Sequence, residues 1–212
     1  NDTATPTTGV LVRETKAAGG IQISASHNPP AYNGIKLFGG DGRVLTADLG
    51  ERVVSRYRSG EIDWVDHTKI GSTQMCDDTT SKHLELVLAN VDVERIRSQH
   101  FTVLLDSNHG AGSILGRKLL EALNCRVTLL GDTPDGQFAH TPEPTAENLK
   151  DVRQNIVDAR AAVGFCQDPD ADRLAVIAKN GRYIGEEYTL VICLDHILSQ
   201  TVGPVVTNCA TS

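Results

Sequence analysis

The segment 19–38 constrains the fold of this chain more than any other. Residues 21–23 alternate apolar and polar side chains and run into the turn Ser24-Ala25-Ser26-His27-Asn28-Pro29-Pro30. The proline pair stops any helix, and Asn33-Gly34 reverses the chain into a second apolar segment ending in Lys36-Leu37-Phe38. The segment predicts two strands joined by a polar loop. A serine on a rigid turn, beside an imidazole, an amide and a lysine, is a candidate nucleophile, and a polar turn without chemistry is the alternative.

A second polar loop, Asp168-Pro169-Asp170-Ala171-Asp172-Arg173, lies between two apolar segments of strand character. Carboxylates this close repel one another, so a cation or an arginine is expected among them. In an extended strand alternate residues lie about 6.6 Å apart, whereas the tight loop favoured by Pro169 lets the carboxylates converge. Oxygen ligands without His or Cys favour Mg²⁺, Mn²⁺ or Ca²⁺ over zinc.

Other kinds of aspartate loop fit less well. A calcium-binding EF-hand needs Gly at its sixth position and Glu at its twelfth, where this chain has Arg173 and Lys179. A phosphatase with an aspartyl nucleophile also places its first Asp after an apolar strand. Here the alternation continues to a third Asp, which suits a metal cage better. A solvated acidic turn stays open as the alternative without function.

The pattern along the chain predicts two consecutive α/β domains, residues 1–97 and 98–212, with mixed, largely parallel sheets covered by helices. Residues 59–80 are polar and irregular, with Trp64 as a local anchor, and the turn Asn108–Gly112 is interpreted as structural in preference to a phosphate contact. Cys166 is interpreted as a packed strand residue. The predicted helices cover 44–58, 81–90, 115–123, 146–158 and 187–198, and the predicted strands of the second domain cover 101–106, 126–130, 163–166, 174–177 and 204–207.

Composition narrows the class of protein. The formal net charge of −7 argues against nucleic acid or an anionic membrane as a partner, and the apolar stretches are too short to span a bilayer. The five cysteines are widely spaced and odd in number, as expected of reduced thiols in a cytoplasmic protein.

The two polar loops together resemble those of the α-D-phosphohexomutases, which comprise phosphoglucomutase, phosphomannomutase and phosphoglucosamine mutase. The stretch 24–29 is similar to their phosphoserine loop, 168–173 to their metal loop, and 33–36 to the segment with their active-site lysine. The stretches 106–112 and 142–149 are similar to landmarks of their second domain. The chain departs from the family at Ser24, where Thr is commoner, and at Pro169, where many members have Gly.

The resemblance implies domain 1 in part and domain 2, without the N-terminal strand or the third and fourth domains that bind the sugar and its phosphate. It implies a reversible transfer of a phosphoryl group between the 1- and 6-positions of a phosphorylated hexose, through phosphorylated Ser26 and a bisphosphate intermediate. One Mg²⁺ would be bound by Ser26, Asp168, Asp170 and Asp172.

The remaining site residues take supporting roles in this interpretation. Lys36 and Arg173 would stabilise charge on the transferring group, and Lys36 would be the general base if its neighbours lowered its pKa. His27 and Asn28 would shape the loop, with His27 a further candidate for proton transfer. The 212 residues alone are expected to be inactive. A non-catalytic phosphoserine and metal scaffold and a phosphatase that forms a serine phosphate stay open as alternatives.

Overall fold

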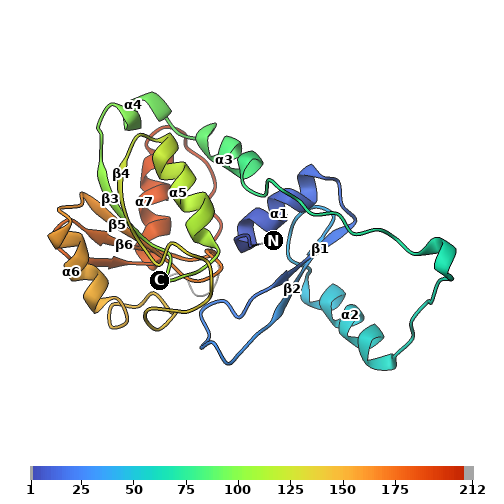
Figure 1. Ribbon diagram of the computed structural model, residues 1–212. Helices are drawn as coiled ribbons and strands as arrows, with labels where there is room; N and C mark the ends of the chain where they lie inside the picture. The colour runs from blue at the N-terminus through green and yellow to red at the C-terminus, as the bar shows by residue number, and fades with distance from the viewer. Residues whose placement is uncertain (1, 208–212) are drawn as a thin grey trace.

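The computed structural model describes residues 2–207 as two units joined by an extended segment (Figure 1). The N-terminal unit contains α1 (Thr5–Glu14), β1 (Gly19–Ile23), β2 (Ile35–Gly39) and α2 (Ala47–Ser59). A short 3₁₀ helix (His67–Lys69), α3 (Ser81–Leu88) and α4 (Val93–Arg97) follow. The C-terminal unit contains β3 (Thr102–Asp106), α5 (Gly112–Ala122), β4 (Arg126–Leu130), α6 (Lys150–Asp158), β5 (Val163–Gln167), β6 (Leu174–Ala178), β7 (Tyr183–Gly185) and α7 (Glu187–Leu198).

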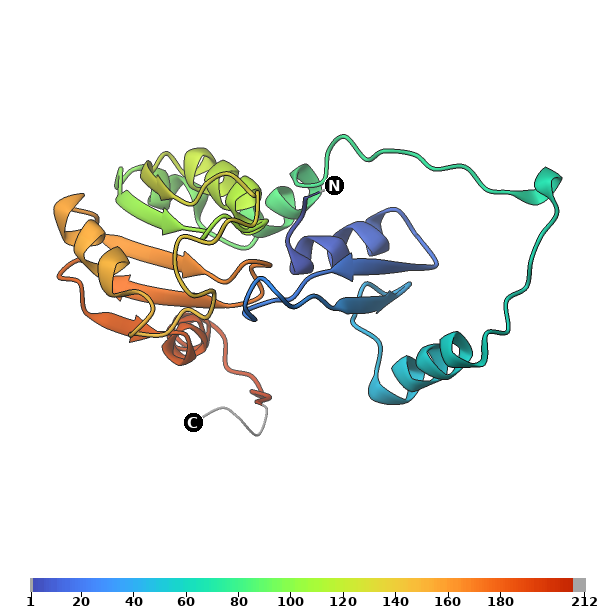
Figure 2. The same cartoon turned by 60° about the horizontal axis from the view of Figure 1, so that its bottom comes forward.

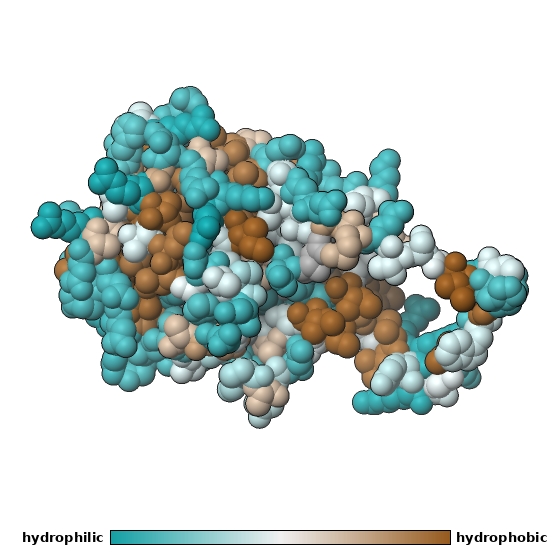
Figure 3. Space-filling model, in the orientation of Figure 1, coloured by the Kyte–Doolittle hydropathy of each residue, from teal (hydrophilic) through white to brown (hydrophobic). Residues whose placement is uncertain are grey.

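In the N-terminal unit, β1 and β2 form an antiparallel two-stranded ribbon. The helix α1 covers one face of it, where the methyl-bearing side chain of Val12 lies directly over Gly20. The opposite face is open to solvent, since Ile21, Ile23 and Ile35 are 66%, 66% and 69% exposed. Figure 3 shows an apolar patch in this part of the molecule.

The C-terminal unit has a five-stranded sheet in the order β4-β3-β5-β6-β7. The strands β4, β3 and β5 are parallel, whereas β6 and β7 are antiparallel additions at one edge. Leu104, Cys166 and Ile177 pack with Ile156 of α6 in one apolar cluster, all fully buried. Val103, Leu105 and Leu120 of α5 form a second cluster. Both faces of this sheet are therefore covered, and the interpretation of Cys166 as a packed strand residue is confirmed.

The predicted α/β class is confirmed. Its parallel strands all lie in the C-terminal sheet, whereas the sheet of the N-terminal unit, which was also expected to be largely parallel, consists of two antiparallel strands. The strand expected over 204–207 is wrong, because these residues belong to no strand. The last strand of the sheet is instead β7, which the turn at Gly181, with φ of 76°, returns against β6. Trp64 is 85% exposed and therefore anchors nothing, since the segment 60–80 runs away from both units (Figure 2).

The helix α1 was not expected from the sequence. Its first turns contain Thr7, Thr8 and Gly9, residues of low helix propensity. These residues are nevertheless buried, together with Val12. Packing against the ribbon and against α3, where Thr7 Oγ1 lies 2.9 Å from His83 Nδ1, therefore outweighs local propensity.

Candidate functional site

The loop after β1 holds Ser26 in an unusual backbone conformation. Its φ is 51°, in the left-handed region that non-glycine residues seldom adopt. The Ser26 amide donates to Ser24 Oγ at 2.9 Å. Asn28 closes the same turn, since its backbone and side-chain amides both donate to the Ala25 carbonyl, at 3.1 and 2.9 Å. Ser24 and Asn28 thus shape the loop without using the Ser26 hydroxyl.

The loop after β5 curves as Pro169 predicts. The carboxylates of Asp168, Asp170 and Asp172 can offer oxygens that all lie within 4.8 Å of one another. Asp168 is fully buried and Asp170 is 3% exposed, whereas Asp172 faces solvent. The Arg173 amide donates to Asp168 Oδ1 at 3.1 Å and so fixes the first carboxylate of the cluster.

The turn 108–112 packs directly against the metal loop. The Ala111 amide donates to the Pro169 carbonyl at 2.8 Å. A Cβ added to Gly110 would lie 2.4 Å from the same carbonyl oxygen, so that only glycine permits the approach. Directly after the end of β3, the Ser107 hydroxyl donates to Gln167 Oε1 at 2.9 Å. These contacts hold the metal loop against the turn, and its predicted structural role stays a prediction.

The two loops meet although they are far apart in the chain. Ser26 Oγ donates to Asp168 Oδ2 at 3.2 Å. Lys36 Nζ donates to Asp170 Oδ2 at 2.6 Å and to Asp172 Oδ2 at 2.7 Å. The serine, the lysine and the acidic cluster therefore form one continuous constellation across the two units.

Burial and charge set the protonation of this cluster. Burial, together with the negative charges of Asp170 and Asp172, raises the pKa of Asp168 to about 7. Burial also acts to raise the pKa of Asp170, but hydrogen bonds from Lys36 and Thr5 outweigh it and lower this pKa. Burial alone would lower the pKa of Lys36, yet its hydrogen bonds to Asp170 and Asp172 raise it. Lys36 is therefore an ammonium in this arrangement.

The donor set fits a hard divalent cation. Asp170 Oδ1 is buried and has no hydrogen-bond partner among the described residues, although its other oxygen has two. An unpaired buried carboxylate oxygen is costly unless a cation completes it. All the candidate ligands are oxygens, which suits Mg²⁺ or Ca²⁺ rather than a thiolate-seeking metal. Asp168, Asp170 and Asp172 could therefore hold a metal ion.

Two further predicted site residues, His27 and Arg173, are not hydrogen-bonded to the acidic cluster through their side chains in the described part of the chain. His27 Nδ1 is 3.4 Å from Ser26 Oγ, near enough to orient the hydroxyl. The Arg173 guanidinium instead points toward Glu143, at 4.0 Å, and Glu186, at 3.8 Å, and no contact with Ser26 is recorded in the described part of the chain. A hollow of about 470 Å³ beside Arg173 and Asp172 leads from solvent to the metal loop.

One residue in contact with the cluster was missed by the sequence analysis. Thr5, the first residue of α1, donates from its hydroxyl to Asp170 Oδ2 at 2.5 Å. Its only signal in the sequence is the Thr5-Pro6 pair, which is typical of a helix start. That signal gives no reason to place α1 beside a loop at the other end of the chain.

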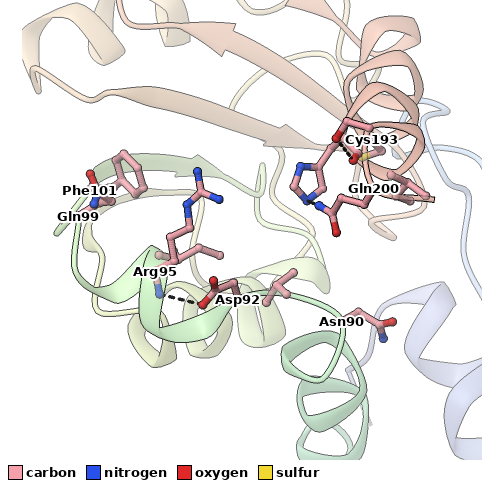
Figure 4. A pocket seen from close by; sticks show the side chains of 12 residues that line it. Asn90, Asp92, Arg95, Gln99, Phe101, Cys193 and Gln200 are labelled. Atoms are coloured by element: carbon pink, nitrogen blue, oxygen red, sulfur yellow. Dashed lines mark hydrogen bonds between the residues drawn. The ribbon is translucent and has the colours of Figure 1, made fainter.

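A separate hollow lies away from this constellation. A cavity of about 1160 Å³ lies between α4 and the end of α7, and Figure 4 shows Arg95, Phe101, Cys193 and Gln200 around it. None of the residues in its wall belongs to the two polar loops. It therefore contributes nothing to the candidate site.

Two family models match this chain. Residues 2–62 match "Phosphoglucomutase/phosphomannomutase, alpha/beta/alpha domain I", and residues 81–181 match the corresponding domain II. The chain belongs to the α-D-phosphohexomutase family. In this family the chain corresponds to two consecutive domains, in the order that the resemblance of the two loops indicated.

Named relatives of this phosphohexomutase chain agree with the assignment. A phosphoglucomutase/phosphomannomutase of Thermococcus kodakarensis is 37% identical over 198 residues, which are 92% of this chain and 43% of the relative. A probable phosphoglucosamine mutase of Pyrococcus horikoshii is 32% identical and covers 96% of this chain and 44% of the relative. The chain thus spans less than half the length of these relatives.

Solved structures have the same fold. A putative phosphomannomutase from Thermus thermophilus superposes with a TM-score of 0.80 at 24% identity, over 95% of this chain and 46% of the other. A phosphoglucomutase/phosphomannomutase family protein from Burkholderia thailandensis gives a TM-score of 0.68 at 29% identity, over 87% and 39%. Within residues 2–207, no helix is both long and apolar enough to span a membrane.

Proposed function

We propose that this chain carries the phosphoserine loop and the metal loop of a phosphohexose mutase. The whole protein would move a phosphoryl group reversibly between the 1- and 6-positions of a hexose or hexosamine phosphate. The observation that carries the proposal is the 3.2 Å hydrogen bond between Ser26 Oγ and Asp168 Oδ2, which joins a nucleophile loop to a metal-binding loop from distant parts of the sequence.

The reaction begins with phosphate on Ser26. A hydroxyl oxygen of the bound sugar monophosphate attacks the phosphorus, the P–Oγ bond of Ser26 breaks, and the proton of the sugar hydroxyl ends on Oγ. The sugar is then a bisphosphate. After it turns over in the site, Ser26 Oγ attacks the phosphorus of its other phosphate, the bond between that phosphorus and the sugar oxygen breaks, and the proton of the Ser26 hydroxyl passes to that sugar oxygen. Free phosphate is neither consumed nor released.

Four oxygens of this chain would surround the cation. Asp168, Asp170 and Asp172 supply one oxygen each, and the phosphate on Ser26 supplies the fourth. A bound Mg²⁺ would withdraw electron density from the transferring phosphoryl group. Phosphoserine adds about two negative charges to a cluster that is already acidic, so that the loops depend on cations at this point.

Lys36 contributes a cation beside the transferring group. Its ammonium lies between Asp170 and Asp172, beside the place where the transferring group would lie, and would stabilise negative charge on the phosphate oxygens. The predicted role of general base requires a lowered pKa, and the aspartates hold the pKa of Lys36 above its ordinary value. We therefore propose charge stabilisation as its main role.

Arg173 and His27 act at the periphery of the reaction. The Arg173 side chain borders the hollow next to Asp172 and can turn from Glu143 and Glu186 onto a substrate phosphate, which binds guanidinium more strongly than a distant carboxylate does. His27, with Asn28, keeps the Ser26 hydroxyl directed at the metal loop.

The experiment is product analysis with the whole protein, of which this chain is a part. Incubation with hexose 1-phosphates and 6-phosphates should interconvert them with no net release of inorganic phosphate. Release of phosphate would indicate the phosphatase, and no turnover with bound metal would indicate the scaffold. Either result would overturn the mutase proposal.

The domain boundaries of the chain and the location of the protein are also proposals. We propose that residues 1–97 and 98–212 are its two domains, and that further domains of the same protein bind the sugar. A cytoplasmic location is supported by the cysteines, since Cys125, Cys166 and Cys193 form no disulfide with any residue between 2 and 207.

A further inference from the structure

The start of α1 is attached to the metal loop rather than capped by its own sequence. The residue before the helix, Ala4, has no side-chain group that can cap it, and Pro6 has no N–H to satisfy. The Thr5 amide donates to the main-chain carbonyl of Asp170 at 2.9 Å. The first free amide of α1 is thus satisfied by a residue of the other unit.

The side chain of Thr5 makes a second bond to the same residue. Thr5 Oγ1 donates to Asp170 Oδ2 in a contact buried from solvent, and Thr5 is only 6% exposed. Attachment through both the main chain and the side chain fixes the orientation of the Asp170 carboxylate, because rotation about its Cβ–Cγ bond would break the hydroxyl bond.

Because of this attachment, the two carboxylate oxygens of Asp170 have different surroundings. Oδ2 accepts from Thr5 and from Lys36, whereas Oδ1 is buried and no group within residues 2–207 donates to it. A carboxylate held in this way presents one oxygen to the acidic cluster at a set angle. The positive end of the α1 dipole at Thr5 further favours the ionised form beside it.

We propose that Thr5 is a positioning residue of the metal loop, which holds Asp170 so that Oδ1 is presented to the cation. The inference rests on the metal site of the proposed function and adds a residue from outside both polar loops. It also makes α1 the mechanical link through which the N-terminal unit sets the geometry of the metal ligands.

The test is calorimetric titration of the 212-residue chain with Mg²⁺ and, separately, Mn²⁺. Thr5→Val removes the hydroxyl at nearly constant volume and should weaken binding about tenfold, as expected for losing a hydrogen bond to a charged group. Thr5→Ser retains the hydroxyl and should bind within about threefold of the unaltered chain. This rescue is not expected if Thr5 merely fills space.

Thr7→Val is the matched control. Thr7 lies in the same helix, is 1% exposed, and bonds through its hydroxyl to His83, away from the metal loop. Thr7→Val should leave metal affinity unchanged even if it lowers the melting temperature. If Thr5→Val does not fold, Thr5→Ala against Thr5→Ser gives the same comparison.

The outcomes separate this inference from the proposed function. Metal binding by the unaltered chain with equal affinity in Thr5→Val would overturn the role of Thr5 and leave the metal loop in place. Equal losses in Thr5→Val and Thr7→Val would also overturn it, because the effect would then be one of helix stability. Absence of Mg²⁺ and Mn²⁺ binding in the unaltered chain would overturn the metal site and the role of Thr5 together.

Discussion

The two units bury their sheets to different degrees. In the C-terminal unit Leu104, Ile156 and Ile177 are fully buried between sheet and helix. In the N-terminal unit the outer face of the ribbon exposes Ile21 and Ile23, and α2 has no buried residue. A two-stranded ribbon is only marginally stable in water by itself, so its order here depends on α1 and on the loops that contact the other unit.

The difference in packing between the two units bears on the candidate site, because each unit supplies part of it. The metal ligands extend from the well-packed sheet, whereas the serine and the lysine come from the weakly packed ribbon. The hydrogen bonds that join the two units at the site start at Thr5, Ser26 and Lys36 and end on the aspartate loop. We expect changes in the first unit to affect chemistry more than stability, and changes in the buried clusters of the second unit to do the reverse.

The largest expected effect is that of Ser26→Ala in the whole protein. Loss of the nucleophile should reduce turnover at least about a thousandfold, because no phosphoserine can form. The melting temperature should fall only slightly, since the substitution removes a hydrogen bond to Asp168 but no buried apolar group. Sugar-phosphate assays and thermal unfolding measure the two effects.

Ser24→Ala is the control from the same loop. Ser24 Oγ accepts from the Ser26 amide and should affect turnover about tenfold at most. Retained turnover in Ser26→Ala, or phosphate mapped reproducibly to Ser24, would contradict the assignment.

A stability pair tests the comparison itself. Ile156→Ala leaves a cavity in the fully buried cluster and should lower the free energy of unfolding by about 2–5 kcal/mol. Ile23→Ala makes the same chemical change on the open face of the ribbon and should cost less than about 0.5 kcal/mol. Urea unfolding followed by circular dichroism measures both, and similar losses would show that the ribbon is packed more firmly than its exposure indicates.

Removing one charge from the metal loop should have a moderate effect. Asp170→Asn keeps the shape of the side chain but weakens the ligand, so that Mg²⁺ affinity should fall about tenfold to a hundredfold. Asp195→Asn changes the charge of the chain equally at an exposed position of α7 and should leave affinity unchanged. If calorimetric titration finds full Mg²⁺ affinity in Asp170→Asn, the loop is an acidic turn and not a metal site.

The smallest expected effect is a pH dependence of stability in the C-terminal unit. Burial acts to lower the pKa of His140, but its hydrogen bond to buried Asp106, at 2.8 Å, outweighs burial and raises that pKa above the ordinary value of 6.5. The stabilisation is therefore complete below about pH 6.5 and is lost as the pH rises through the raised value.

His140→Gln provides the comparison, because glutamine can still donate to Asp106 but does not titrate. The difference in unfolding free energy between the two proteins should shrink as the pH rises above about 6.5. A constant difference across that range would show that the pair contributes no charge interaction.

Much of the site could be predicted because its signals are local. The proline pair at 29–30, the Asn33-Gly34 turn and the spacing of the aspartates each act over a few residues, and β1, β2 and the curved metal loop follow from them. The helix α7 begins at Glu187 and ends at Leu198, as its apolar run predicted. Grouping the loops into one site, however, rested on resemblance rather than on any local rule.

The sequence by itself determined the strand patterns, the loops and the types of ligand, because these depend on side-chain chemistry and on short-range backbone preferences. The tertiary structure decided what depends on distant neighbours. It made a helix of residues 5–14 against their propensity, placed β7 at the edge of the sheet, and kept Lys36 charged by surrounding it with Asp170 and Asp172. These features depend on burial and on interactions between residues that are distant in the sequence. Neither can be read from a local stretch of residues, because the fold decides which residues become neighbours.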